Sequence, residues 1–255
     1  MRSPDELRAE VEEYLDGLEL SPELGGLDEV VRYALAGGGK RIRPVLCLAT
    51  AEAAGGEPDR ALPAAAALEL IHSFSLVHDD LPAMDDDAER RGRPTAHVRF
   101  GEASAILAGD ALLAEAFRLA VSVRAEMAQE LARATLGMIG GQYLDVDGGR
   151  RDRAELNRLK TGRLFDASVG CGLWATAVPP EQQAPWREFG ADYGFLYQVV
   201  DDLLDDDGFV QELGRARTLE LATKTEDSAR ARLLELDADT SVLDELVDEL
   251  TERIS

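Results

Sequence analysis

Segment 60–81 limits the possible folds most strongly, because it is apolar almost all round and then ends in aspartates. A helix that is apolar on every side is stable only when other elements bury it. Segment 182–206 also becomes apolar as it approaches its own aspartates. Two buried helices that each carry carboxylates at one end can face each other across a central cavity, and we expect this arrangement.

Helix signals run through the whole chain, and no stretch shows the sustained two-residue alternation of a β-strand. The first helix is marked by a capping box with proline at its first position, Ser3-Pro4-Asp5-Glu6. We therefore predict an all-α fold, a large antiparallel bundle around a central cavity. The helices are expected at 4–16, 27–36, 42–54, 60–81, 102–122, 126–144, 152–177, 182–206, 210–236 and 240–253.

Composition narrows the function and the location. With 255 residues, 45% of them apolar, the chain suits one large domain over 1–255. A net charge of −23 argues against nucleic acid as a partner, because its phosphates would be repelled. No signal region or membrane span is apparent, and Cys47 and Cys171 are too few for a disulfide framework. We expect a soluble, cytoplasmic protein.

The first acidic cluster follows the apolar segment and contains Asp79, Asp80 and Asp85. Clustered carboxylates repel one another unless a cation lies among them, and hard oxygen ligands suit Mg²⁺. Pro82 disturbs the helix, so the chain can fold back and bring Asp85 toward Asp79. The arginines that follow at 90–91 match phosphate oxygens. A metal beside arginines indicates a diphosphate substrate.

The second acidic cluster contains Asp201, Asp202 and Asp205, with Gln198 before them. On a helix, Asp201 and Asp205 share one face and Gln198 lies one turn earlier. That face can hold a metal. In so acidic a protein, surface decoration is the alternative.

Two basic groups lie elsewhere in the chain. Lys40, Arg41 and Arg43 follow a glycine run that can expose N–H groups to an anion, or can simply end a helix. Lys160-Thr161 precedes an apolar helical run, where a lysine that extends toward solvent is the alternative.

Five motifs occur in order between Leu27 and Asp206: GGGKRIRP, IHSFSLVHDDLPAMDDD, RRGRPT, KTGRLF and YQVVDDLLDD. This series resembles the trans-isoprenyl diphosphate synthases, the farnesyl and geranylgeranyl diphosphate synthase family. The resemblance implies an isoprenoid-synthase bundle, commonly a homodimer, that uses three Mg²⁺ ions per active site. Its substrates would be isopentenyl diphosphate and an allylic diphosphate, whether dimethylallyl, geranyl or farnesyl.

The resemblance also implies a role for each matching residue. Mg²⁺ would be bound at Asp79, Asp85, Asp201 and Asp205, with Asp80 and Asp202 in support. The diphosphate of isopentenyl diphosphate would lie against Lys40, Arg43, His72 and Arg91. Arg90 and Lys160 would hold the allylic diphosphate, and the Lys160-Thr161 backbone with Gln198 would polarise the site of the carbocation. His78 and His97 are expected to be structural.

The region 207–255 departs from the family pattern. Members usually continue with a Gly-Lys pair and a K-x-T-Y-P segment, whereas here Asp207-Gly208-Phe209 leads almost directly to Leu213-Gly214. We therefore predict a deletion and a weaker lid. Two other functions are considered. A terpene cyclase would lack the GGGKRIRP site, and a regulatory subunit would not need intact aspartates in both clusters.

Product length depends on the residues before the first acidic cluster. Phe74 and Ser75 lie five and four positions before Asp79, which is about 7.5 and 6 Å along a helix axis. In bacterial farnesyl synthases of the family, an aromatic at the Phe74 position often accompanies two extra residues in the first motif, here Pro82-Ala83. This favours farnesyl diphosphate over geranylgeranyl diphosphate as product, although Phe74 as ordinary core is the alternative.

Overall fold

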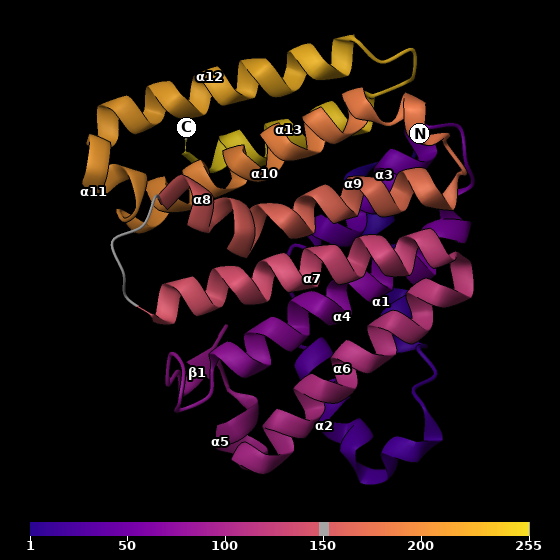
Figure 1. Ribbon diagram of the computed structural model, residues 1–255, viewed down its shortest axis with the longest axis vertical. Coiled ribbons are helices and arrows are strands. Elements are labelled where there is room, and N and C mark those ends of the chain that lie inside the picture. The colour runs from indigo at the N-terminus through magenta and orange to yellow at the C-terminus, as the bar shows by residue number, and fades with distance from the viewer. Residues whose placement is uncertain (148–152, 255) are drawn as a thin grey trace.

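The structure, a computed structural model, describes residues 1–147 and 153–254, and its described part is predominantly helical. Figure 1 shows the long helices stacked side by side, from α12 through α10, α9 and α7 to α4 and α6. The all-α prediction is confirmed. The α-helices are α1 (Pro4–Asp16), α2 (Asp28–Leu35), α3 (Ile42–Ala53), α4 (Leu62–Asp79), α5 (Ala96–Phe100), α6 (Glu102–Val123), α7 (Ala125–Val146), α8 (Arg153–Asn157), α9 (Arg163–Ala175), α10 (Ala184–Asp205), α11 (Phe209–Leu213), α12 (Arg215–Leu234) and α13 (Ser241–Thr251).

Short elements connect these helices. The 3₁₀ turns are η1 (Pro22–Leu27), η2 (Pro58–Ala61), η4 (Pro180–Gln182) and η5 (Glu252–Ile254), and η3 (Arg158–Gly162) is a π-helical turn. A small antiparallel hairpin, β1 (Glu89–Arg90) and β2 (Arg93–Pro94), follows the first acidic cluster.

Helix α1 begins where the capping box predicts. The Ser3 hydroxyl accepts from the Glu6 N–H at 3.3 Å, and the Ser3 N–H donates to the Glu6 carboxylate at 2.8 Å. The apolar side chains Leu7, Val11 and Leu15 recur at helical spacing and are all buried. The local sequence therefore sets both the start of α1 and its inward face.

Helix α4 is the buried central element that its composition predicts, and it packs against α3, α6 and α9. Its alanines at 64–67 are all buried, which lets neighbouring helices approach closely. The segment Asp59–Asp79 is long and apolar enough to cross a membrane, but 67% of its apolar window is buried inside the fold. Here those apolar residues form the core of the bundle.

Several predicted boundaries are wrong for local reasons. The predicted helix 152–177 is interrupted by the π turn η3, and its first residue lies outside the described part of the chain. The predicted helix 210–236 is two helices, because Gly214 adopts a φ of 84° and breaks it. Helix α4 ends at Asp79, before the predicted end at 81. Helix α5 and the hairpin were not predicted.

Candidate active site

A cavity of about 590 Å³ opens beside α4, α7 and α9, a size typical of small-molecule sites. Its walls bring together predicted site residues from distant parts of the sequence. They are Arg43, His72, Phe74, Ser75, Asp79, Lys160 and Thr161. Most other lining residues are apolar, among them Leu81, Met84, Met138 and Ile139. The cavity therefore combines charged groups with an apolar wall.

The chain turns back immediately after α4, as Pro82 predicts. The Asp85 N–H donates to the Asp79 carbonyl at 2.9 Å, and the Met84 N–H donates to the Leu81 carbonyl at 2.8 Å. The pKa of Asp79 is raised to about 6, mainly by burial; Lys160 opposes this shift, and the neighbouring Asp85 adds to it. The turn therefore places these carboxylates close enough to repel each other.

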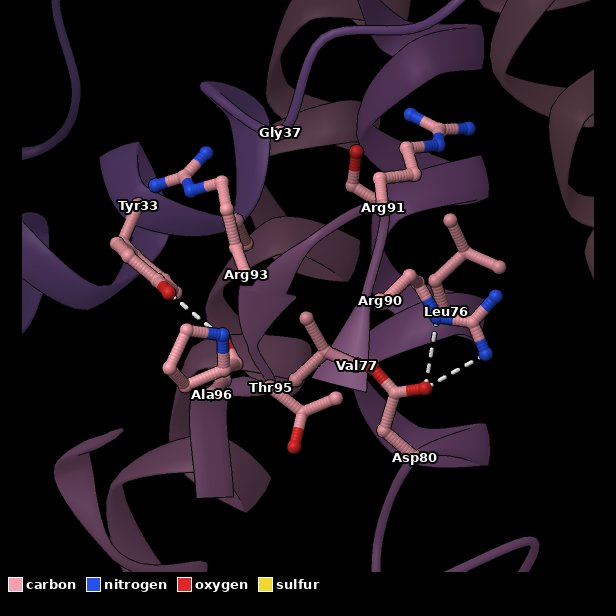
Figure 2. A pocket seen from close by; sticks show the side chains of 13 residues that line it. Tyr33, Gly37, Leu76, Val77, Asp80, Arg90, Arg91, Arg93, Thr95 and Ala96 are labelled. Carbon is pink, nitrogen blue, oxygen red and sulfur yellow. Dashed lines mark hydrogen bonds and ion pairs between the residues drawn. The ribbon is translucent and has the colours of Figure 1, made fainter. Parts of the chain in front are cut away.

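Asp80 is buried and holds Arg90. One carboxylate oxygen accepts from Arg90 Nε at 2.7 Å and lies 2.6 Å from Nη2 (Figure 2). Charge-assisted bonds of this kind fix the guanidinium in direction as well as place. The structure thus assigns Asp80 to positioning Arg90, while its predicted support of a metal is untested.

The basic hairpin rests on the end of α2. Arg93 donates to the Ala36 carbonyl at 2.7 Å, and Arg91 donates to the Gly38 carbonyl. The Tyr33 hydroxyl donates to the Pro94 carbonyl at 2.6 Å (Figure 2). Carbonyls at a helix C-terminus lack helical partners and attract cations. The glycine run therefore meets the arginine run here, although the two are far apart in the sequence.

Arg43 and His72 form a polar wall of the cavity, on which Arg43 is the cation. The Arg43 guanidinium lies 4.5 Å from the centroid of the Phe165 ring, and its buried Nε has no partner among the described residues. Burial lowers the pKa of His72 well below its usual range, and the nearby Arg43 and Arg91 lower it further, so this imidazole is neutral at pH 7. An unpaired buried donor beside a neutral imidazole suits an anionic ligand.

The other two basic residues of the GGGKRIRP motif point elsewhere. Lys40 lines a separate hollow of about 440 Å³ together with Arg253, and burial lowers the pKa of Lys40. Arg41 is buried in an ion pair with Glu69 and also bonds Glu12 at 2.8 Å. Arg41 is therefore a structural residue. The prediction that it belongs to an anion site with Lys40 and Arg43 is wrong.

The Lys160-Thr161 pair lies in the π turn η3, an irregularity common at functional sites. Gly141 of α7 permits close packing there, because a Cβ at this position would lie 2.5 Å from the Lys160 backbone nitrogen. The Lys160 ammonium lies 2.6 Å from an Asp145 carboxylate oxygen. The π turn explains why the predicted continuous helix is wrong here.

Gln142 and Asp145 are candidate site residues that the sequence analysis did not identify. Both polar atoms of the Gln142 amide are buried without a partner in the described part of the chain, at the cavity wall. Such groups are costly unless a ligand or water completes them. The sequence does contain a signal for this pair, because Gln142 and Asp145 are polar residues three positions apart on an otherwise apolar helix face.

The second acidic cluster lies on α10, where Asp201 and Asp205 are one helical turn apart as predicted. Gln198 donates to Asp202 at 2.7 Å, and Asp202 also accepts from the Phe209 N–H at 2.8 Å, which closes the α10–α11 turn. Gln198 does not line the central cavity. Asp201 is instead bound to Arg253 at 2.9 Å, and Asp205 is exposed. Arg253 is a further residue that sequence patterns did not identify.

Comparison with known proteins identifies the family. A sequence profile described as polyprenyl synthetase matches residues 25–224. The chain belongs to the polyprenyl synthetase family.

The relatives are similar over most of their length. A farnesyl diphosphate synthase of Micrococcus luteus is 39% identical, and the match covers 91% of this chain and 82% of the relative. A geranylgeranyl diphosphate synthase of Cyanophora paradoxa is 42% identical, and the match covers 76% of this chain and 70% of the relative. The crystal structure of a Zymomonas mobilis enzyme described as an FPP/GFPP synthase superposes with a TM-score of 0.88 at 32% identity, covering 96% of each chain. The bundle is thus the fold of this family.

Asp79 and Asp85 suit a Mg²⁺ site that water and substrate phosphates complete. Within residues 1–147 and 153–254, no three His, Cys, Asp or Glu side chains converge into a metal cage. Mg²⁺ does not need one, because it is usually held by one or two carboxylates, waters and substrate phosphates. The close carboxylates Asp79 and Asp85, with the raised pKa of Asp79, fit such a site. Family membership and donor chemistry agree on this point.

Proposed function

We propose that this polyprenyl synthetase is a short-chain trans-prenyltransferase that condenses isopentenyl diphosphate with an allylic diphosphate, dimethylallyl, geranyl or farnesyl. The observation that carries the proposal is the single cavity that joins Arg43, His72, Asp79 and Lys160 to an apolar wall. The charged end suits diphosphates, and the apolar wall suits a prenyl chain. Names of the relatives given above agree with this substrate class.

The chain's own groups account for much of the chemistry. When the allylic C–O bond breaks, the diphosphate leaves with the electron pair, and Lys160 and Arg90 stabilise its charge. The double bond of isopentenyl diphosphate then attacks the carbocation, and a proton leaves to pyrophosphate. Arg43, His72 and Arg91 orient isopentenyl diphosphate, while apolar walls keep water from the cation.

The remaining predicted residues extend this assignment. Mg²⁺, three ions per site, would supply Lewis-acid neutralisation of the diphosphates, held by Asp79, Asp85, Asp201 and Asp205. Lys40 would extend the isopentenyl diphosphate site. Thr161 and Gln198 would contribute to the carbocation site, and Asp202 would support the second cluster.

Product length is proposed to depend on Phe74, with Ser75 beside it. Both line the cavity, and the Phe74 side chain is only 7% exposed. A bulky ring at the wall stops an elongating chain, which favours farnesyl over geranylgeranyl diphosphate. Phe74→Ala should lengthen the product by at least one isoprene unit. Unchanged products would show that Phe74 is ordinary core.

A homodimer in the cytoplasm is proposed, with each chain a single domain. Helices α6 and α7 expose large apolar side chains, which commonly mark an interface. Those that do not line the cavity are Ile106, Leu107, Val121 and Leu136. Sedimentation of the purified protein should give twice the chain mass of 27.6 kDa.

Two incubations separate the candidate functions. The protein is incubated with dimethylallyl and isopentenyl diphosphates and Mg²⁺, and the products are separated by chromatography. A prenyltransferase forms longer linear diphosphates. A cyclase given geranyl or farnesyl diphosphate alone forms cyclic hydrocarbons or alcohols, and a regulatory subunit forms nothing. Either of the last two results would refute the proposal.

A further inference from the structure

The side chain of His78 lies between the cavity wall and helix α6. Its imidazole contacts the Phe74 ring one turn earlier on α4, with ring centroids 5.0 Å apart and planes at 73°. Edge-to-face pairs of this kind are favourable beyond their buried area. Both side chains line the cavity. His78 is therefore the direct neighbour of the ring proposed to stop the chain.

His78 is itself held from the other side. Its Nε2 lies 3.0 Å from the Ile106 carbonyl oxygen of α6, so the acceptor assigns the proton to Nε2. Gly109, one turn further along α6, provides the space. A Cβ there would lie 2.1 Å from His78 Nε2 and 2.4 Å from its Cδ2. No side chain larger than hydrogen fits at position 109 without moving the imidazole.

We propose that His78 is a positioning residue for product length, which acts by holding Phe74 at the cavity wall. The hydrogen bond to Ile106 and the slot at Gly109 fix the imidazole, and the imidazole fixes the ring. Helices α4 and α6 are the most extensively packed pair in the described fold, so they form a rigid base (Figure 1). The proposal rests on the proposed chain-stop role of Phe74.

Loss of this support should let the Phe74 ring turn away from the cavity. His78→Ala removes the ring contact, and Gly109→Ala displaces the imidazole from α6. Both variants should form products at least one isoprene unit longer than the wild type. Phe74→Ala/His78→Ala should match Phe74→Ala alone, because a residue that acts through another adds nothing once the other is gone.

The experiment measures product chain length with labelled isopentenyl diphosphate, and circular dichroism checks folding. His97→Ala controls for loss of a histidine, since His97 contacts Thr95 and is absent from the cavity wall. Gly140→Ala controls for the glycine change, because a Cβ there meets nothing within 4 Å. Both controls should keep the wild-type product. If Gly109→Ala does not fold, the product length of His78→Ala alone tests the positioning role.

The outcomes distinguish the positioning role of His78 from the proposed chain-stop role of Phe74. If Phe74→Ala lengthens the product and His78→Ala does not, the positioning role is wrong and the chain-stop role stands. If Phe74→Ala leaves the product unchanged, both are wrong, although prenyl transfer itself is still observed. A double variant with longer products than Phe74→Ala would make His78 part of the cavity floor. The KM for isopentenyl diphosphate should stay within about two-fold of wild type in His78→Ala, and a larger rise would overturn a role confined to product length.

Discussion

Arg253 donates to a carboxylate oxygen of Asp201 over 2.9 Å, so the C-terminal η5 turn is joined to the second acidic cluster. The other terminal nitrogen of Arg253 is buried without a partner among the described residues. An internal cation thus neutralises the carboxylate that is proposed to bind a metal. Arg253 and the proposed metal ion would therefore compete for the same carboxylate oxygen of Asp201.

Arg253→Gln should therefore strengthen Mg²⁺ binding to the substrate-free protein. A partly exposed ion pair contributes ~1 kcal/mol, which corresponds to roughly five-fold in affinity. Isothermal titration with Mg²⁺ measures the change. Arg8→Gln serves as control, because Arg8 lines the same hollow but pairs with Asp5 and Glu249. Weaker binding in Arg253→Gln would show that Arg253 supports the site.

Asp79→Ala should lower kcat by orders of magnitude, and EDTA should abolish turnover, because the carboxylate is proposed as a metal ligand. The measurement is steady-state turnover at saturating substrates and Mg²⁺. Asp86→Asn changes an exposed carboxylate of the same loop and should retain about wild-type kcat. Substantial turnover in Asp79→Ala would refute the metal assignment.

The two diphosphate sites should separate kinetically. Arg43→Ala should raise the KM for isopentenyl diphosphate roughly ten-fold or more, as expected when a charged hydrogen bond of ~1.5–3 kcal/mol is lost. Lys160→Ala should instead raise the KM for the allylic substrate or lower kcat. Initial rates with each substrate varied in turn test this. Equal effects of both variants on one substrate would contradict the division of the sites.

Asp166→Asn should stabilise the protein in a pH-dependent manner. Burial raises the pKa of Asp166 from 3.8 to about 6, so the folded state binds its proton more tightly than the unfolded state. Stability is therefore lost as the pH rises between these values. The advantage of the Asn variant should grow by ~1 kcal/mol from pH 5 to pH 8 in urea unfolding. A difference that stays constant with pH would contradict this account.

Arg41→Met should destabilise the fold without affecting substrate binding. It leaves Glu69 buried at 5% side-chain exposure without its cation, and breaking a buried pair costs about 3–5 kcal/mol. Arg41→Met/Glu69→Leu should recover much of the loss, because both charges are then removed. Urea unfolding and KM values measure the two effects. A large change in KM at unchanged stability would show instead that Arg41 takes part in substrate binding.

Local sequence was sufficient wherever neighbours along the chain decide the structure. The capping box at Ser3 marked the start of α1, and the apolar length of 60–81 indicated a buried central helix. Pro82 correctly predicted the turn that brings Asp85 back to Asp79. Each of these features depends on residues within a few positions, whose propensities and periodicity are visible in the sequence.

Tertiary contacts decided the rest. The sequence by itself determined the helical class and the main acidic and basic motifs, because these are written in residue type and spacing. It did not show that Arg41 would pair with Glu69, that Asp202 would close the α10–α11 turn, or that Arg253 would reach Asp201. Which charge a side chain meets depends on packing between distant segments. Burial and pairing are properties of the folded chain, and only the fold sets them.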